Sequence, residues 1–183
     1  MPRRKTQADA EVLAAAHRLI HAHGPDALTF AALARATGLS ASTLVQRFAS
    51  KAGLMRATLH HAWDRLDERT TRLGETTPTT PEGAIALLVE LSRAYGDIES
   101  YAEGLLVLRE DLRDPVLRAR GAAWKTALSG ILDRCLGGRP DGLGLMMAAQ
   151  WQGALLWWSF EPQGAVEDFV EAQLRRFVAA VLR

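Results

Sequence analysis

The stretch TFAALARATGLSASTLVQRF, residues Thr29–Phe48, contains two short helical patterns separated by almost no loop. It predicts helices over residues 30–36 and 41–48, with Thr29 and Ser40 as caps whose side chains accept backbone N–H groups at the helix starts. Helices this short are marginal in water, because isolated helices need roughly 12–15 residues to be stable. Both therefore have to pack against another part of the chain.

The junction between the two patterns predicts a sharp turn. Gly38 can adopt the left-handed backbone conformation that ends a helix. Leu39 then points inward and joins Leu33, Leu44 and Phe48 in a shared core. Residues 9–23 have apolar positions at helical spacing and predict the helix that supports the other two. Two short helices braced on a third form a helix-turn-helix unit.

The outward face of the second short helix is polar. Because Leu44 faces inward, the residues facing outward include Ser42, Thr43, Gln46 and Arg47. Serine and threonine can reach base edges or phosphates, glutamine can pair with adenine, and arginine binds phosphate or guanine. A polar outward face is also typical of any solvated helix, and from these residues alone that interpretation stays open.

Basic residues are concentrated at the N-terminal end. Residues 1–56 contain eight Lys and Arg against three Asp and Glu, whereas the remaining 127 residues contain 14 against 18. A basic end on a mildly acidic body indicates contact with a polyanion, although a chance fluctuation in composition explains it equally well. Arg3, Arg4 and Lys5 form a basic arm that could add contacts to DNA.

Residues 12–59 resemble the DNA-binding unit of the tetracycline-repressor (TetR) family of bacterial transcriptional regulators. The family pattern is T…IA…G(V/L)S.GTLY.HF.SK..L, and this chain carries LARATGLS, TL, RF and SK..L in the same order. The resemblance implies phosphate contacts from Thr29, Ser40, Arg47 and Lys51, and groove-facing side chains at Ser42, Thr43 and Gln46. The family usually has Gly at position 42 and Tyr at position 45. This chain has Ser42 and Val45, and valine cannot donate the phosphate hydrogen bond of that tyrosine.

The rest of the chain also reads as helical. No stretch alternates as a strand would, so the sequence predicts an all-α fold of about nine helices. The later helices are expected over residues 51–72, from Pro81, and over 100–112, 115–136, 141–160 and 166–182, with residues 74–81 as the only clear linker. Residues 1–50 are predicted to be the helix-turn-helix DNA-binding domain, and residues 51–183 a helical effector-binding and dimerisation bundle.

The helix expected over residues 141–160 is apolar on every side. Such a helix has to be buried on every side. One side can cover the chain's own core, and the last helix adds an apolar stripe, so we predict a homodimer with a four-helix interface. A large core that absorbs both faces is the alternative. The predicted interface residues are Met147, Ala154, Leu155, Trp158, Phe169, Val170, Gln173 and Phe177. Two recognition helices roughly 34–36 Å apart would read a palindromic operator in double-stranded DNA.

The TetR resemblance also implies a chamber for a small-molecule effector. Large apolar and aromatic side chains lie on the helices that line the family's pocket: Trp63, Leu88, Leu91, Tyr95, Leu108, Trp124, Leu128 and Trp151. They favour an apolar or aromatic ligand. Core packing explains any one of them equally well.

Other classes of function find little support in the sequence. No segment approaches the roughly 20 apolar residues of a membrane span, and Cys135 is the only cysteine. His17 and His21 lack a third metal ligand, and the run REDLRD, residues 109–114, predicts a solvated, salt-bridged helix end. The sequence therefore predicts a cytoplasmic, non-enzymatic regulator without cofactor or metal. The TetR resemblance implies a repressor that its ligand releases from DNA, and an activator of the same fold is an alternative that the sequence does not distinguish. The other alternative is a helical ligand-binding protein or enzyme of the same fold that has lost DNA binding, for which Val45 is the only support.

Overall fold

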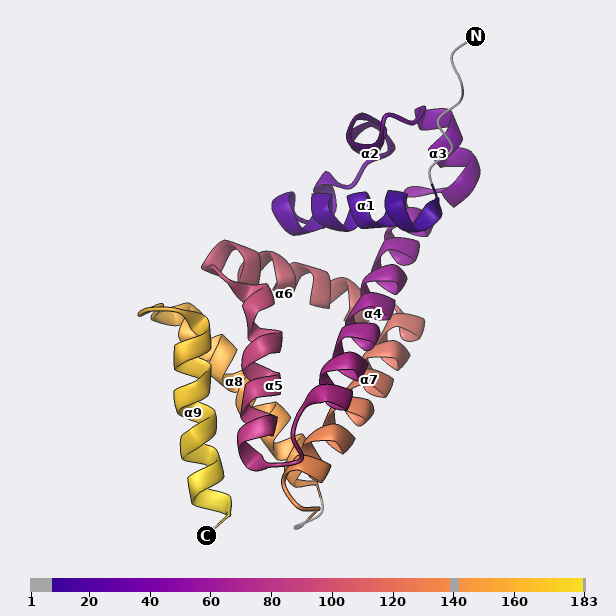
Figure 1. The fold of residues 1–183 in the computed structure, drawn as a ribbon. Coiled ribbons are helices and arrows are strands. Elements are labelled where there is room, and N and C mark those ends of the chain that lie inside the picture. The colour runs from indigo at the N-terminus through magenta and orange to yellow at the C-terminus, as the bar shows by residue number, and fades with distance from the viewer. Residues whose placement is uncertain (1–7, 139–141, 183) are drawn as a thin grey trace. The chain divides into compact units, whose positions relative to one another are not determined.

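The computed structural model describes residues 8–138 and 142–182, which form nine α-helices and two 3₁₀ helices and contain no strand (Figure 1). In chain order the helices are α1 (Asp9–His23), η1 (Pro25–Ala27), α2 (Phe30–Thr37), α3 (Ala41–Phe48), α4 (Lys51–Thr76), α5 (Pro81–Ser92), η2 (Arg93–Tyr95), α6 (Ile98–Arg113), α7 (Pro115–Cys135), α8 (Leu143–Phe160) and α9 (Val166–Val181). The predicted all-α fold is confirmed. No helix in the described ranges combines the length and the apolar character that crossing a membrane requires.

The chain divides into two compact units. The first contains the described residues up to Leu66 together with Ala102–Arg120, and the second contains Asp67–Tyr101 and the described residues from Gly121 onward. The division falls within α4, α6 and α7 rather than in loops. The boundary predicted at residue 50 divides a DNA-binding domain from an effector-binding and dimerisation domain. It is a division by function, and it stays a prediction.

The start of the first unit is held by a core shared among α1, α2, α3 and α4. Its most deeply buried side chains are Val12, Ala16, Ile20, Leu28, Leu33, Leu44 and Leu54, with Leu39 also buried. Gly38 has φ 71° and ψ 13°, the left-handed conformation that the turn requires. The Thr29 side chain accepts a hydrogen bond from the Ala32 amide at 3.0 Å, and Ser40 accepts one from the Thr43 amide at 3.1 Å. The predicted caps, turn and core are confirmed.

The linker before α5 is shorter than predicted, because α4 continues to Thr76. Gly74 lies within the helix, where an added Cβ would come 2.7 Å from Cδ1 of Ile131. The glycine therefore serves close packing in the second unit and does not end the helix. Helix α5 begins at Pro81, as predicted, and Thr80 caps it by accepting the Gly83 amide at 3.1 Å.

The second unit is built around α5, α8 and α9, which pack side by side (Figure 1). Trp151 of α8 is fully buried, and its Nε1–H donates to the Ser92 hydroxyl of α5 at 2.8 Å. The Gly144 amide, near the start of α8, donates to Asp133 of α7 at 2.6 Å. These polar contacts fix α8 against both neighbours.

We expect Gly24→Ala to lower the free energy of unfolding by about 1–3 kcal/mol, measured by urea denaturation. Gly24 ends α1 with φ 77° and ψ 167°, a backbone conformation available almost only to glycine. A Cβ there would also come 2.7 Å from Oε2 of Glu103. The matched control is Gly130→Ala in α7, where no atom lies within 4 Å of the added Cβ. The two variants should change stability in opposite directions; equal effects would contradict the prediction.

Candidate nucleic-acid interface

The polar residues of α3 stand on a helix whose position is fixed by its buried side. Leu44 is completely buried, whereas Ser42 and Gln46 are exposed and Thr43 is partly exposed. The hydroxyl of Ser40 lies 2.9 Å from that of Ser42 and 2.8 Å from that of Thr43. Three hydroxyls therefore gather at the N-terminus of α3, where the free amides and the helix dipole favour an anion such as a phosphate.

The predicted phosphate contacts lie at the starts of α2, α3 and α4 and at the end of α3. Thr29 and Lys51 are exposed, and the Lys51 ammonium donates to the Asp26 carbonyl oxygen at 3.4 Å. Arg47 forms an ion pair with Asp9 of α1, with Nη1 and Oδ1 3.1 Å apart. Because Asp9 is well exposed, such a pair contributes only about 0–1 kcal/mol and can be exchanged for a phosphate. The basic arm of Arg3, Arg4 and Lys5 lies outside the described residues.

Val45 faces solvent on the same helix, with 43% of its surface exposed. The structure thus gives position 45 the outward orientation that a phosphate-contacting side chain needs. An isopropyl group offers no hydrogen bond there. The remaining polar groups of α3 have to supply the contacts.

The predicted effector residues fall into both compact units. Trp63 and Leu108 belong to the first unit, and the other six belong to the second. Leu88, Leu91, Leu128 and Trp151 are buried in the second unit. These four side chains are buried as core residues are. Their burial alone does not distinguish residues that line a ligand pocket from residues that only pack the core.

Aromatic contacts link several of these residues. The Trp124 and Trp151 rings are 6.4 Å apart, and Trp124 donates to the Thr70 hydroxyl at 2.9 Å. Tyr95 meets Tyr101 edge to face at 5.7 Å. Burial raises the pKa of the Tyr95 phenol above its ordinary value of 10.0.

Asp111 is a buried carboxylate that the sequence did not reveal. The run of residues 109–114 was expected to be a solvated helix end, and this is wrong for Asp111, which is 8% exposed. It is correct for Asp114, which pairs with Arg56 at 2.6 Å. The available signal was helical spacing: Asp111 follows Val107 by one turn, and Val107 packs against the core of the first unit.

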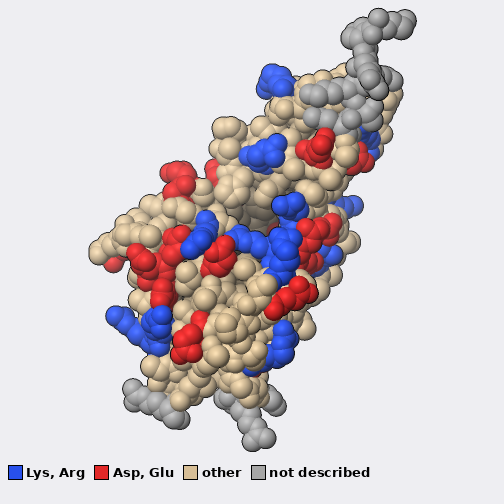
Figure 2. Space-filling view, in the orientation of Figure 1, with Lys and Arg blue, Asp and Glu red and all other residues tan. Residues whose placement is uncertain are grey.

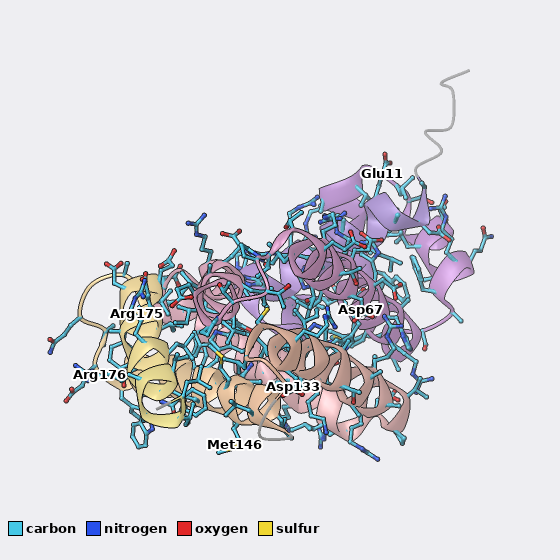
Figure 3. All side chains as sticks on the ribbon, turned by 60° about the horizontal axis from the view of Figure 1, so that its bottom comes forward. Glu11, Asp67, Asp133, Met146, Arg175 and Arg176 are labelled. Carbon is cyan, nitrogen blue, oxygen red and sulfur yellow. The ribbon has the colours of Figure 1, made fainter. Side chains whose placement is uncertain are left out.

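The predicted dimer residues do not form the exposed side of α8. Met147, Ala154, Leu155 and Trp158, as well as Val170 of α9, are buried within the chain itself, and Phe169, Gln173 and Phe177 are partly buried. The large apolar side chains that α8 exposes are Leu145, Met146, Leu156, Trp157 and Phe160. Met146 lies on the outer side of α8 (Figure 3). The exposed apolar side of α8 is therefore made by neighbours of the predicted residues, and the interface itself stays a prediction.

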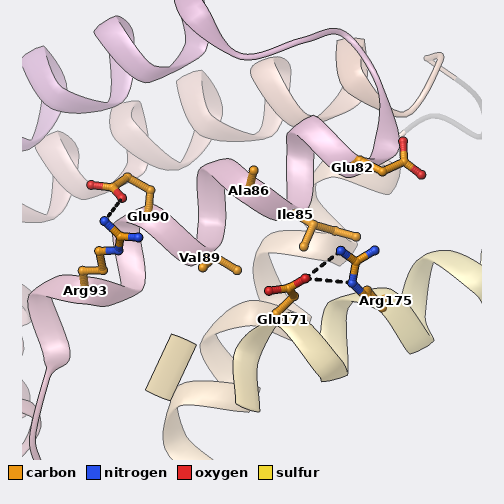
Figure 4. Close-up of a pocket in the computed structure, with 8 residues that line it drawn as sticks. All are labelled: Glu82, Ile85, Ala86, Val89, Glu90, Arg93, Glu171 and Arg175. Carbon is orange, nitrogen blue, oxygen red and sulfur yellow. Dashed lines mark hydrogen bonds and ion pairs between the residues drawn. The ribbon is translucent and has the colours of Figure 1, made fainter. Parts of the chain in front are cut away.

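A pocket of about 320 Å³ lies between α5 and α9 (Figure 4). Its lining residues are Glu82, Ile85, Ala86, Val89, Glu90, Arg93, Glu171 and Arg175, and none of them is a predicted effector residue. Four of its five charged side chains pair with one another, Arg175 with Glu171 at 2.6 Å and Arg93 with Glu90 at 3.0 Å. Acidic and basic side chains are also interspersed over the visible face of the second unit (Figure 2). The pocket therefore presents little unpaired charge to a ligand.

Metal binding finds no support in residues 8–138 and 142–182, where no three His, Cys, Asp or Glu side chains could hold an ion together. His17 and His21 stack edge to face with ring centroids 6.1 Å apart. Burial, and then the charges of His21 and His61, lower the pKa of His17.

Solved structures with the same fold include several regulators. A tetR-family transcriptional regulator from Streptomyces coelicolor superposes with a TM-score of 0.76 at 15% identity, over 96% of this chain and 83% of that chain. A protein of Saccharomonospora viridis assigned as a transcriptional regulator, in complex with choline, gives 0.75 at 19% identity, over 96% and 98%. The regulator FadR from Bacillus subtilis, in complex with stearoyl-CoA, gives 0.71 at 16% identity, over 95% and 100%.

The sequence itself matches one family model and no curated protein significantly. The matching model is that of bacterial regulatory proteins of the tetR family, and it covers residues 12–58. Those residues comprise most of α1, all of α2 and α3, and the first turns of α4. Residues 12–58 thus contain the helix-turn-helix unit of the tetR family of bacterial regulatory proteins, and the whole chain shares its fold with such regulators.

Proposed function

We propose that this protein is a homodimeric, non-enzymatic repressor of the tetR family in the cytoplasm, and that a small-molecule effector releases it from a palindromic operator. The observation that carries the proposal is the exposed polar face of α3, held in place by the buried Leu44. Ser42, Thr43 and Gln46 on this face suit base edges in a major groove. Thr29, Ser40, Arg47 and Lys51 would hold the flanking phosphates.

Dimerisation is supported by the exposed apolar side of α8. Monomeric proteins rarely leave a continuous apolar patch uncovered. Trp157 is 67% exposed and Phe160 is 70% exposed, with ring centroids 5.9 Å apart. A second copy of the chain would cover this side by a two-fold axis, because such an axis brings the same patch of both subunits together. The two α3 helices would then read the two halves of a palindrome.

Control by a ligand is supported by solved structures of the same fold, two of which are complexes with choline and with stearoyl-CoA. In this chain the effector would contact some of the predicted aromatic and leucine residues. Release then follows from linkage: a ligand that prefers a conformation unsuited to the operator weakens DNA binding, and DNA weakens ligand binding by the same factor.

Selection of random duplex DNA with the purified protein, at near-physiological salt, tests the proposal. Enrichment of a two-fold symmetric sequence is the expected result. Binding to that sequence should also weaken steeply with salt, because several phosphates are neutralised. A folded protein that enriches no sequence would overturn the proposed function and direct the search to the helical bundle.

We expect Arg47→Ala to lower affinity for the selected operator about tenfold and to reduce the slope of log K against log salt by about one. The reason is the loss of one phosphate contact at the end of α3. Fluorescence anisotropy over a range of salt measures both quantities. Arg72→Ala is the matched control, since Arg72 is an exposed arginine of the second unit. Asp9→Asn breaks the ion pair while keeping the guanidinium, so it should not weaken binding; parallel losses in all three variants would contradict the assignment.

A further inference from the structure

Asp111 of α6 is a buried carboxylate. Its one hydrogen bond in the described chain comes from the indole Nε1–H of Trp63 on α4, at 3.1 Å, and among those residues it forms no ion pair. Its neighbours Glu110 and Asp114 do pair, with Arg113 and Arg56. A buried charge that lacks a partner is costly, so a chain rarely keeps one without a use for it.

The groups around Asp111 replace only part of the hydration that its carboxylate loses on burial. The pKa of the Asp111 carboxyl is raised, chiefly by burial. The hydrogen bond from Trp63 partly opposes this shift, the charge of Glu110 adds to it, and the charge of His60 opposes it. One indole N–H replaces only part of the hydration that a carboxylate loses on burial. A cation brought to this carboxylate would therefore gain a strong, poorly screened interaction.

An exposed apolar stripe runs along α6 beside this carboxylate. Leu105, Leu108 and Leu112 are spaced by three and four residues, so they share one side of the helix, and all three are exposed. Leu108 also precedes Asp111 by three residues, which places the two side chains next to each other. Exposed leucines in a row, bordering a buried carboxylate, have the chemistry of a site for a ligand with a hydrocarbon part and a positive charge.

We infer that Asp111, Trp63 and the leucine stripe Leu105–Leu108–Leu112 form a binding site, and that the effector of this regulator is an amphipathic organic cation. The carboxylate takes the ammonium group, the indole borders it as aromatic rings commonly border alkylated ammonium ions, and the leucines cover the hydrocarbon. This inference rests on the proposed function and adds a positive charge to the apolar or aromatic ligand that the sequence predicted. It also gives Trp63 and Leu108 a shared role within the first unit.

Calorimetric titration of the full chain with decyltrimethylammonium, decanol and decanoate, each below its aggregation limit, tests the charge preference. The cation should bind about tenfold or more tightly than the alcohol, and the carboxylate least. Asp111→Asn should remove that advantage while leaving decanol affinity unchanged. The matched control is Glu110→Gln, one residue away and already paired, which should keep the preference. A cation that binds no better than the alcohol, or a preference that survives in Asp111→Asn, overturns the inference.

Stability supplies a second readout that a purely structural carboxylate would not give. Because burial raises the pKa of Asp111, the ionised form destabilises the fold above that pKa, and its neutral isostere should raise the melting temperature at neutral pH. A lower melting temperature in Asp111→Asn would mark the carboxylate as structural and overturn the inference.

Operator binding is measured on the same preparations. If the cation binds at Asp111 but does not release DNA, the ligand class stands and the proposed release fails; if another compound releases DNA and the cation does not bind, the inference alone fails.

Discussion

Replacing both Trp157 and Phe160 with glutamate should convert the protein into a monomer and lower its affinity for the selected operator by about 100-fold or more. The two rings are among the most exposed large apolar groups of the chain and lie together on α8. In a two-fold interface each patch is used twice, so every substitution is felt twice. Two carboxylates in each subunit would also be buried without partners in the dimer. Light scattering measures the assembly, and anisotropy measures the affinity.

The controls separate a lost interface from a damaged fold. Because both side chains lie at the surface, the variant monomer should keep the helical content of the parent protein. Ile98→Glu and Leu106→Glu add the same charge at exposed apolar positions of another helix, α6, and both should remain dimeric. A double variant that stays dimeric would show that another surface joins the subunits.

The helix-turn-helix unit was predictable because its signals are local. Thr29 and Ser40 cap helices through atoms three residues away, and Gly38 takes the conformation that its missing Cβ allows. A cap or a turn is decided by neighbours in sequence, so sequence alone suffices. The end of α4 was missed because Gly74, placed in the predicted linker, packs against Ile131, far away in the chain.

The sides of α8 could not be predicted from its sequence. A helix that is apolar all round has no periodic pattern to show which side meets the core, and the choice depends on where α5, α7 and α9 pack. Trp158 is buried while Trp157, the next residue, is exposed, although the two are chemically identical. The burial of Asp111 was missed for a related reason, because it depends on α6 packing against Trp63 of another helix. Partners distant in sequence settle both cases.

Leu44→Ala should lower the free energy of unfolding by about 2–5 kcal/mol and abolish operator binding under conditions where the rest of the chain stays folded. Leu44 is completely buried in the core that joins α1, α2 and α3. With eight residues, α3 cannot persist without this contact, since short helices depend on tertiary packing. Urea denaturation measures the stability, and hydrogen exchange of the α3 amides measures the local loss.

The adjacent residue provides the control for that prediction. Val45→Ala also shortens an aliphatic side chain of α3, but at an exposed position, and should change stability by less than about 0.5 kcal/mol. Operator affinity should fall as the exchange rates of the α3 amides rise. Val45→Ala should bind nearly as tightly as the parent protein, and Leu44→Ala far more weakly. If Leu44→Ala frees the α3 amides to exchange and still binds the operator with parental affinity, then α3 is not the reading helix. In that case its polar face is the ordinary solvated surface that the sequence also allowed.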